Sequence, residues 1–236
     1  MEEIYHITGS APGSLWETME LLQQAATGHS HDLQIHFERM LEEFHCLWMI
    51  VRGKVHLDRL PQGEVEIRTW LRKPSSLVSI RDYSIWEGEE EIGYGIYSWA
   101  LVSAESRKLV SMKSVPPVMA APTVMPEREG AVKRITLPEN MTEEALWTVR
   151  PEEIDKNGHV NNTVYLDRAE QLTGTFGAER SPKELTVCYL SEVRLGERIT
   201  LSWTDFGGDG LTLDGTRPRA DGGEKPERVF AAKLIF

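Results

Sequence analysis

The apolar positions in the first half of the chain follow a helical period once and a strand period several times. After residue 14 they recur at i, i+4, i+7 and i+11, which predicts a helix with one wide apolar face. These positions are Leu15, Met19, Leu22 and Ala26. Segments rich in Val, Ile, Trp and Tyr follow at 46–57, 63–71, 77–86 and 92–104, separated by turn-like Pro, Gly and Ser clusters. They predict an antiparallel meander, preceded by a short strand at 4–7.

The second half of the chain repeats this order. Its pattern predicts a strand over 145–149, a helix over 161–176, and strands over 184–193, 198–206, 211–217 and 228–236. The duplication indicates an α+β fold in which an antiparallel sheet wraps around a long helix twice, with the two sheets able to join edge to edge. A Pro-rich, polar passage separates the halves. We therefore expect domains at 1–120 and 136–236, with a linker at 121–135.

The segment 29–45 is charged and carries four histidines. It lacks strand character and predicts a mobile flap or short helix that covers a binding tunnel. The side chains expected to face inward are Phe37, Met40, Leu41 and Phe44. No Cys or acidic residue completes a standard ligand set around the histidines, so we expect no metal site.

Composition narrows the class of protein. The chain has 236 residues, 40% of them hydrophobic and 27% charged, as in an ordinary globular protein. No apolar run approaches the ~18 residues of a spanning helix, and the N-terminus lacks the pattern of a signal peptide. We therefore expect a cytoplasmic protein without a membrane span. A net charge of −11 argues against broad nucleic-acid binding. Cys46 and Cys188 are expected to be buried free thiols.

The segment DKNGHVNNTVY, residues 155–165, combines a carboxylate, a carboxamide and an imidazole just before the second predicted helix. A helix N-terminus offers N–H groups to a developing oxyanion. Three other interpretations compete. A hairpin tip at Asn157-Gly158 lacks a returning alternating strand, and a calcium loop lacks the glycine and glutamate it needs at its sixth and twelfth positions. The third is a polar helix cap in which His159 is incidental.

These residues resemble the acyl-acyl carrier protein thioesterases. The resemblance rests on Asp155, Asn157, His159 and the VNN run that follows, together with Glu192 about thirty residues later. Matching motifs in the first half extend it over nearly the whole chain: QQAAT at 23–27, LWMI at 47–50, Arg52, TW at 69–70, RDY at 81–83 and SWA at 98–100.

The resemblance implies a tandem hot-dog fold and hydrolysis of the thioester between a fatty acyl chain and the phosphopantetheine of acyl carrier protein, within fatty acid biosynthesis. It implies no cofactor. Only the second half should be catalytic, because the stretch at 10–14 before the first helix has no carboxylate, carboxamide or imidazole. The first half would supply the acyl pocket, with Met19, Leu22 and Ala26 as its lining. Val193 stands where plant members carry a cysteine, which argues against a covalent cysteine mechanism.

The four polar residues can divide the work of thioester hydrolysis. Glu192, expected on a strand that shares a face with Cys188 and Leu190, would act as general base directly or through His159. Asn157 and the backbone N–H groups of a helix starting at Asn161 and Asn162 would bind the substrate carbonyl. Asp155 would orient the turn, although the roles of the two carboxylates are interchangeable at this stage.

Other functions stay open on sequence alone. Coenzyme A presents the same phosphopantetheine arm as carrier protein, so an acyl-CoA thioesterase competes closely. A hot-dog hydratase and a non-catalytic acyl-binding module fit the polar set less well. Carrier protein is acidic, so a local basic patch is needed on this acidic chain; the candidates are Arg68, Arg72 and Lys73, or Lys133 and Arg134. Both a monomer and a homodimer are compatible with the sequence.

Overall fold

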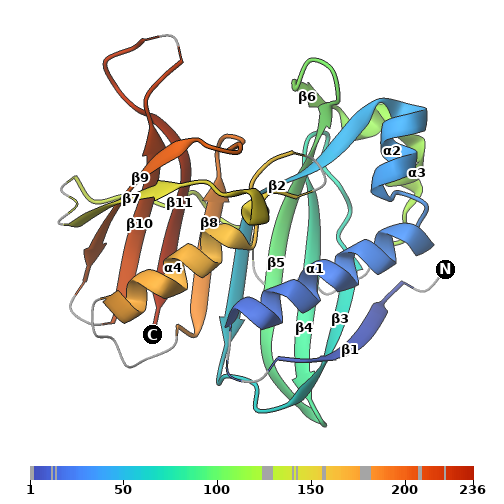
Figure 1. The fold of residues 1–236 in the computed structure, drawn as a ribbon. Coiled ribbons are helices and arrows are strands. Elements are labelled where there is room, and N and C mark those ends of the chain that lie inside the picture. Colours follow the sequence, from blue (N-terminus) through green and yellow to red (C-terminus); the bar gives the residue numbers. More distant parts are fainter. Residues whose placement is uncertain are drawn as a thin grey trace. The chain divides into compact units, whose positions relative to one another are not determined.

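The structure is a computed structural model that describes residues 3–11, 13, 15–123, 130–139, 141, 143–155, 158–175, 182–206, 209–220 and 222–236 (Figure 1). The chain divides into two compact units, Met1–Val132 and Lys133–Phe236. No helix among the described residues has the length and apolar character needed to cross a membrane.

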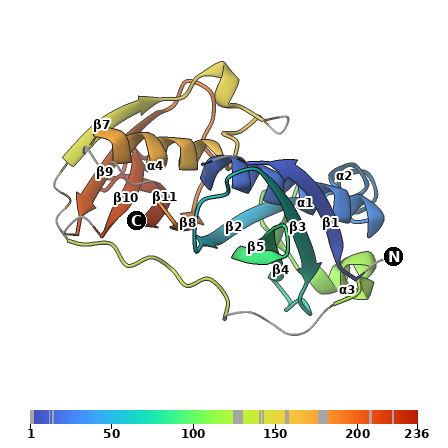
Figure 2. The same cartoon turned by 90° about the horizontal axis from the view of Figure 1, so that it is seen from below.

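The N-terminal unit is an antiparallel sheet with a long helix, α1, across one face (Figures 1 and 2). The strands lie in the order β1-β3-β4-β5-β2, and β6 pairs with β5. The elements are β1 (Tyr5–Ser10), α1 (Leu15–Asp32), α2 (Phe37–Phe44), β2 (Cys46–Leu57), β3 (Glu64–Leu71), β4 (Ser79–Glu87), β5 (Glu90–Ser103), β6 (Leu109–Val110), the 3₁₀ turn η1 (Met112–Ser114) and α3 (Pro116–Ala120). The helix and the strand meander predicted for this half are confirmed, with boundaries shifted by a few residues.

The apolar face of α1 packs onto the sheet as its spacing predicts. Leu15, Met19, Leu22 and Ala26 are each at most 4% exposed. Gly95 on β5 permits the close approach, because a Cβ at that position would lie 3.0 Å from a methyl carbon of Leu22. Burial of this stripe therefore fixes the helix against one face of the sheet.

The segment predicted as a flap or short helix forms α2, which joins a second apolar cluster of the same unit. Met40 and Cys46 are fully buried in it, whereas Phe37 and Leu41 are only half-buried. The rings of His31 and His36 stack at 4.3 Å between centroids. Among the described residues, no group of three potential ligands is arranged to hold a metal ion.

A buried ion pair joins the end of β3 to β4. Arg72 donates from Nε and Nη2 to the two carboxylate oxygens of Asp82, at 2.6 and 2.7 Å. Their side chains are 3% and 0% exposed. The suggestion that Arg72 contributes to a carrier-docking patch is therefore wrong, because its guanidinium is enclosed and neutralised. Arg68 forms two hydrogen bonds with Glu66, which leaves Lys73 as the remaining cation of that group.

The C-terminal unit repeats the arrangement with α4 across one face of its own sheet (Figures 1 and 2). Its antiparallel strands lie in the order β8-β11-β10-β9-β7. The elements are β7 (Glu143–Thr148), the 3₁₀ turn η2 (Pro151–Glu153), α4 (Val164–Thr175), β8 (Glu184–Tyr189), β9 (Arg198–Asp205), β10 (Gly210–Arg217) and β11 (Glu227–Ile235). Joining of the two sheets edge to edge stays a prediction.

An aromatic cluster attaches α4 to its sheet. Tyr165 meets Trp147, Tyr189 and Phe230 edge to face, at 5.7, 5.3 and 4.8 Å between ring centroids. Edge-to-face pairs add to the free energy gained from burying the rings. Burial raises the pKa of the Tyr165 hydroxyl well above its usual range, so this side chain stays protonated.

Two element boundaries differ from the sequence prediction in ways that matter for the site. The helix expected from residue 161 begins at Val164. The strand expected to reach Val193 ends at Tyr189, because the N–H groups of Leu190 and Ser191 both donate to the carbonyl of Val229, at 2.9 and 3.1 Å. The chain thereby leaves the ladder, and Glu192 lies on a loop instead of a strand. Cys46 and Cys188 are buried free thiols, as expected.

Candidate active site

The loop from β7 to α4 is anchored by a buried carboxylate. Glu153 is 5% exposed and accepts hydrogen bonds from the Arg150 N–H at 2.8 Å and the Trp147 indole at 3.0 Å, and it pairs with Arg168. Burial alone would raise the pKa of Glu153, but these hydrogen bonds outweigh it and lower the pKa. The Glu153 carbonyl accepts the N–H of Asn161 at 2.9 Å. One glutamate therefore holds both ends of the loop.

The tip of this loop is a tight turn centred on Gly158. The N–H of Asp155 donates to the carbonyl of His159 at 2.8 Å, and Gly158 donates back to the Asp155 carbonyl at 3.1 Å. Gly158 has a φ of +78°, in the left-handed region that glycine adopts readily. Ile154 and Val160 form one isolated antiparallel bridge across the turn. The sequence argued against a hairpin here, and the structure contains a single bridge instead of two paired strands.

The turn presents His159 to Glu192. His159 Nε2 lies 2.8 Å from Glu192 Oε2, and the two side chains are 14% and 20% exposed. One residue further along each segment, the Val160 N–H donates to the Val193 carbonyl at 2.8 Å. Val193 is fully buried. The imidazole and the carboxylate are therefore brought together by a main-chain hydrogen bond as well as by their own contact.

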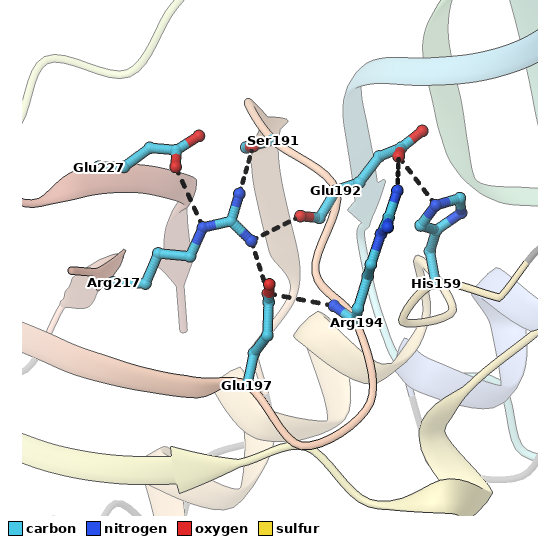
Figure 3. Close-up of polar contacts among 7 residues, drawn as sticks. All are labelled: His159, Ser191, Glu192, Arg194, Glu197, Arg217 and Glu227. Carbon is cyan, nitrogen blue, oxygen red and sulfur yellow. Dashed lines mark hydrogen bonds and ion pairs between the residues drawn. The ribbon is translucent and has the colours of Figure 1, made fainter. Parts of the chain in front are cut away.

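The loop that carries Glu192 is held by an arginine that the sequence reasoning missed (Figure 3). Arg217, at the end of β10, donates from Nη1 to the Glu192 carbonyl at 2.8 Å and from Nη2 to Ser191 Oγ at 2.9 Å. It also binds the carboxylates of Glu197 at 2.5 Å and Glu227 at 3.1 Å. Burial alone would lower the pKa of Arg217, but these two carboxylates raise it. No motif in the sequence marks this residue.

A second arginine faces the same carboxylate from the solvent side. Arg194 Nη2 lies 3.7 Å from Glu192 Oε2, and its side chain is 63% exposed (Figure 3). At that distance and exposure the contact is a weak, salt-screened attraction. Figure 3 shows the Arg194 guanidinium and the His159 ring beside the same Glu192 carboxylate.

The remaining predicted polar residues lie around this pair. Asp155 Oδ1 accepts the His159 N–H at 3.4 Å, so its carboxylate supports the turn. Asn161 Oδ1 accepts the N–H of Thr163 at 3.2 Å, and the Asn162 carbonyl accepts the Tyr189 hydroxyl at 2.9 Å. Asn157 lies outside the described residues.

The backbone donors expected for an oxyanion are partly taken up within the loop. The N–H of Asn161 donates to Glu153, that of Thr163 to Asn161 Oδ1, and that of Val164 to the Asn161 carbonyl. The start of α4 therefore offers fewer donors than a free helix N-terminus would.

The residues predicted to line the acyl pocket lie in the core of the N-terminal unit. Met19, Leu22 and Ala26 pack under α1 with 3%, 1% and 4% exposure. A cavity in the same unit has other walls, contributed by the end of α1, the α1–α2 connection and strands β2 to β5. They are Ser30, Ile35, Trp48, Leu71, Ser79, Arg81 and Trp99. The acyl-lining role of the α1 stripe stays a prediction.

Comparison with solved structures defines the fold class, the hot-dog fold. The chain is similar to an acyl-ACP thioesterase from Bacteroides thetaiotaomicron, with 20% identity over 100% of both chains and a TM-score of 0.79. It is also similar to the 12:0-ACP thioesterase from Umbellularia californica, with 16% identity, a TM-score of 0.82, and coverage of 100% of this chain and 97% of the other. A MaoC-like dehydratase from Phytophthora capsici matches at 10% identity and a TM-score of 0.53, over 80% of this chain and 71% of the other.

Family models identify the chain more narrowly. The model of the acyl-ACP thioesterase N-terminal domain matches residues 4–116, and the model of the C-terminal domain matches residues 137–219. The chain belongs to the acyl-ACP thioesterase family, so it is a thioester hydrolase. No curated protein matches it significantly.

Proposed function

We propose that this enzyme hydrolyses the thioester of fatty acyl-acyl carrier protein and releases a free fatty acid, with Glu192 and His159 at the centre of the reaction. The observation that carries the proposal is their 2.8 Å contact at a place that solvent reaches, since each side chain keeps some exposure. A carboxylate within hydrogen-bond distance of an imidazole is a common arrangement for moving protons during hydrolysis.

In the proposed reaction, Glu192 accepts a proton from the water that attacks the thioester carbon, directly or through His159. The C–O bond forms, the carbonyl oxygen becomes anionic, and the C–S bond then breaks. The proton passes to the departing sulfur, so water and thioester yield a carboxylic acid and a thiol. His159 orients the Glu192 carboxylate, and Arg217 fixes the loop behind it. No cysteine is needed, and Val193 follows the glutamate.

The oxyanion requires a donor, and we assign this role to the Asn157 amide. Three N–H groups near the start of α4 already donate to partners in the loop, so they are not available to the oxyanion. A side-chain donor is therefore the better candidate. Removing one oxyanion donor typically lowers kcat by ~10²–10³. Asp155 supports the same turn through the His159 N–H, and Asn161 and Asn162 would contact the substrate next to it.

The choice of carrier protein over coenzyme A rests on the family. Acyl carrier protein is acidic, and this chain has a net charge of −11, so docking requires a local positive surface. Lys133 and Arg134 are both exposed and remain the better candidate pair. Comparing kcat/KM for one acyl group on the two carriers tests the preference. Equal or higher values on coenzyme A would refute it.

The first test of the proposed function is the release of thiol from acyl-carrier protein, followed with a thiol reagent. We expect turnover by the wild type and a loss of about 10²-fold or more in His159→Ala, because acid–base groups typically contribute ~10²–10⁴-fold. His56→Ala, in the other unit, is the matched control and should keep the wild-type rate. Equal rates in both variants, or no hydrolysis by the wild type, would refute the proposal.

Arg217 is expected to act as a positioning residue. In Arg217→Gln the Glu192 loop loses three polar anchors, so we expect kcat to fall roughly tenfold while KM changes less than about twofold. Arg217→Lys should restore part of kcat, since it keeps the charge but not the fork of donors. Arg228→Gln breaks a comparable ion pair with Asp214 on the same sheet and serves as the control. A parallel loss of kcat in the control would assign the effect to general weakening of the sheet.

A further inference from the structure

The N-terminal unit contains a small cavity with a charged group in its wall. Its volume is about 40 Å³, which is room for about three water molecules at the ~10–15 Å³ that each requires. Ile35, Leu71 and the rings of Trp48 and Trp99 form its apolar side. Arg81, which is 3% exposed, contributes a guanidinium. A space of this size admits a small ion with one or two waters.

Arg81 has no acidic partner in the described part of the chain. Its Nη1 donates to His29 Nδ1 at 2.8 Å and to Thr69 Oγ1 at 3.2 Å. A guanidinium cannot accept a hydrogen bond, so His29 accepts through an unprotonated Nδ1 and is neutral. Asp82 follows in the sequence, but successive strand residues face opposite sides of the sheet, and its carboxylate pairs with Arg72. The contacts of Arg81 therefore leave its charge without compensation.

A buried cation without a counter-ion is costly. Arg72 lies equally deep, at 3% exposure, but Asp82 neutralises it through two hydrogen bonds. Burial lowers the pKa of Arg81 from its ordinary value, yet arginine keeps its proton in proteins. The positive charge at the cavity wall is thus permanent, and an anion inside the cavity would offset the cost of burying it.

Two further donors belong to the same wall. The indole N–H of Trp99 is buried and has no acceptor among the described residues, whereas that of Trp48 donates to the Ile35 carbonyl at 2.8 Å. Ser79, 4% exposed, brings a hydroxyl group. None of the described residues that line the cavity is acidic. Buried donors are satisfied in the great majority of cases, so this wall is rich in donors and short of acceptors.

From these observations we infer that the cavity is a binding site for chloride, held by the Arg81 guanidinium with Trp99 and Ser79 as further donors. A monovalent ion cancels the single charge of the wall, and chloride is only slightly larger than the water molecules for which the cavity has room. A sulfate or phosphate ion is larger and would leave an excess of negative charge. A bound ion would stabilise the folded N-terminal unit. The site is independent of the proposed hydrolysis.

Chloride binding can be measured as thermal stabilisation of the full chain. Melts in sodium chloride and in sodium gluconate at equal ionic strength separate a bound ion from general screening, because gluconate is too large for a cavity of about 40 Å³. We expect chloride to raise the Tm by about 3 °C or more relative to gluconate. The increase should saturate with chloride concentration, as binding to a site requires.

The same comparison in variants assigns the stabilisation to the cavity. Arg81→Met should abolish the difference between the two salts, and Arg81→Lys should keep part of it because it retains the charge. Trp99→Phe removes one N–H donor and should weaken chloride binding by about threefold or more. Lys108→Gln removes an exposed positive charge from the same unit. It is the matched control and should keep the wild-type difference.

The inference fails on either of two results. Equal Tm values of the wild type in the two salts would show that the cavity holds water only. A folded Arg81→Met variant that keeps the full difference would place the effect of chloride elsewhere. If Arg81→Met does not fold, Trp99→Phe decides in its place, and unchanged chloride affinity in that variant would refute the site.

Anomalous scattering locates the ion directly. Crystals of the full chain grown in sodium bromide should contain an anomalous peak inside the cavity, within hydrogen-bond distance of the Arg81 guanidinium. Peaks confined to the protein surface would mean an adventitious ion only and would overturn the inference. His159→Ala should lose hydrolysis and keep the chloride dependence of the Tm, so failure of the catalytic proposal leaves the binding result readable.

Discussion

Glu192→Gln is expected to lower kcat by about 10²–10⁴-fold, because the amide keeps the size of the side chain but cannot accept the proton of the attacking water. The amide oxygen of glutamine can still take part in the 2.8 Å contact with His159, and Arg217 binds the main-chain carbonyl of residue 192, which the substitution leaves unchanged. The loop should therefore keep its conformation. Single-turnover release of thiol from acyl-carrier protein, measured beside a thermal melt, separates chemistry from folding.

Glu152→Gln is the matched control for this substitution. Glu152 is an exposed glutamate in η2 of the same unit, and its pair with Arg150 is long, at 3.9 Å. The Glu152→Gln enzyme should hydrolyse substrate at the wild-type rate. A Glu192→Gln enzyme with more than about a tenth of the wild-type kcat would remove Glu192 as the base. Asp155 was the other carboxylate predicted from the sequence to act as base, so Asp155→Asn would be the next variant to measure.

Asp82→Ala is expected to lower the free energy of unfolding of the N-terminal unit by about 3–5 kcal/mol, because it leaves the Arg72 charge buried without its partner. Both side chains of the pair are almost completely enclosed, so water cannot replace the lost carboxylate. The melting temperature should fall by roughly 10 °C. Calorimetry or far-UV circular dichroism measures the change.

The double variant Arg72→Met/Asp82→Leu distinguishes the cost of an isolated charge from the value of the pair. Replacing a whole buried pair with apolar residues of similar size is often nearly neutral, so the double variant should melt closer to the wild type than Asp82→Ala does. Two results would show that the buried charge is not the source of the loss. One is a double variant that loses at least as much free energy of unfolding as Asp82→Ala, and the other is Asp82→Ala with wild-type stability.

Helices and strands could be predicted from the sequence where apolar residues recur with a helical or a strand period. The stripe of Leu15, Met19, Leu22 and Ala26 faces one sheet, and alternating segments such as 46–57 and 198–206 form strands. The ends of elements were harder to predict, because they depend on hydrogen bonds to distant residues. β8 ends early since two successive N–H groups converge on the Val229 carbonyl, and nothing near Tyr189 in the sequence encodes that contact.

The residue types of the candidate site could be predicted from the sequence, but their arrangement in space could be predicted only in part. Asp155, His159 and Glu192 stand out by residue type, and the structure places the last two in contact. Arg217 could not be found from sequence, because it reaches residues 20 and 26 positions earlier in the chain and belongs to no motif. A tunnel beneath segment 29–45 was predicted, but the side chains that line the cavity were not, since its walls come from separate elements that only the folded sheet brings together.

The hydrogen bond from the Val160 N–H to the Val193 carbonyl has a consequence for how this site tolerates change. Both the donor and the acceptor of this hydrogen bond are main-chain groups. Other side chains at positions 160 and 193 would therefore preserve the spacing between the imidazole and the carboxylate. Side chains at positions 160 and 193 are thus free to drift within the limits of apolar packing. Only proline at 160, or a shift in the number of residues on either segment, would uncouple the two reactive groups.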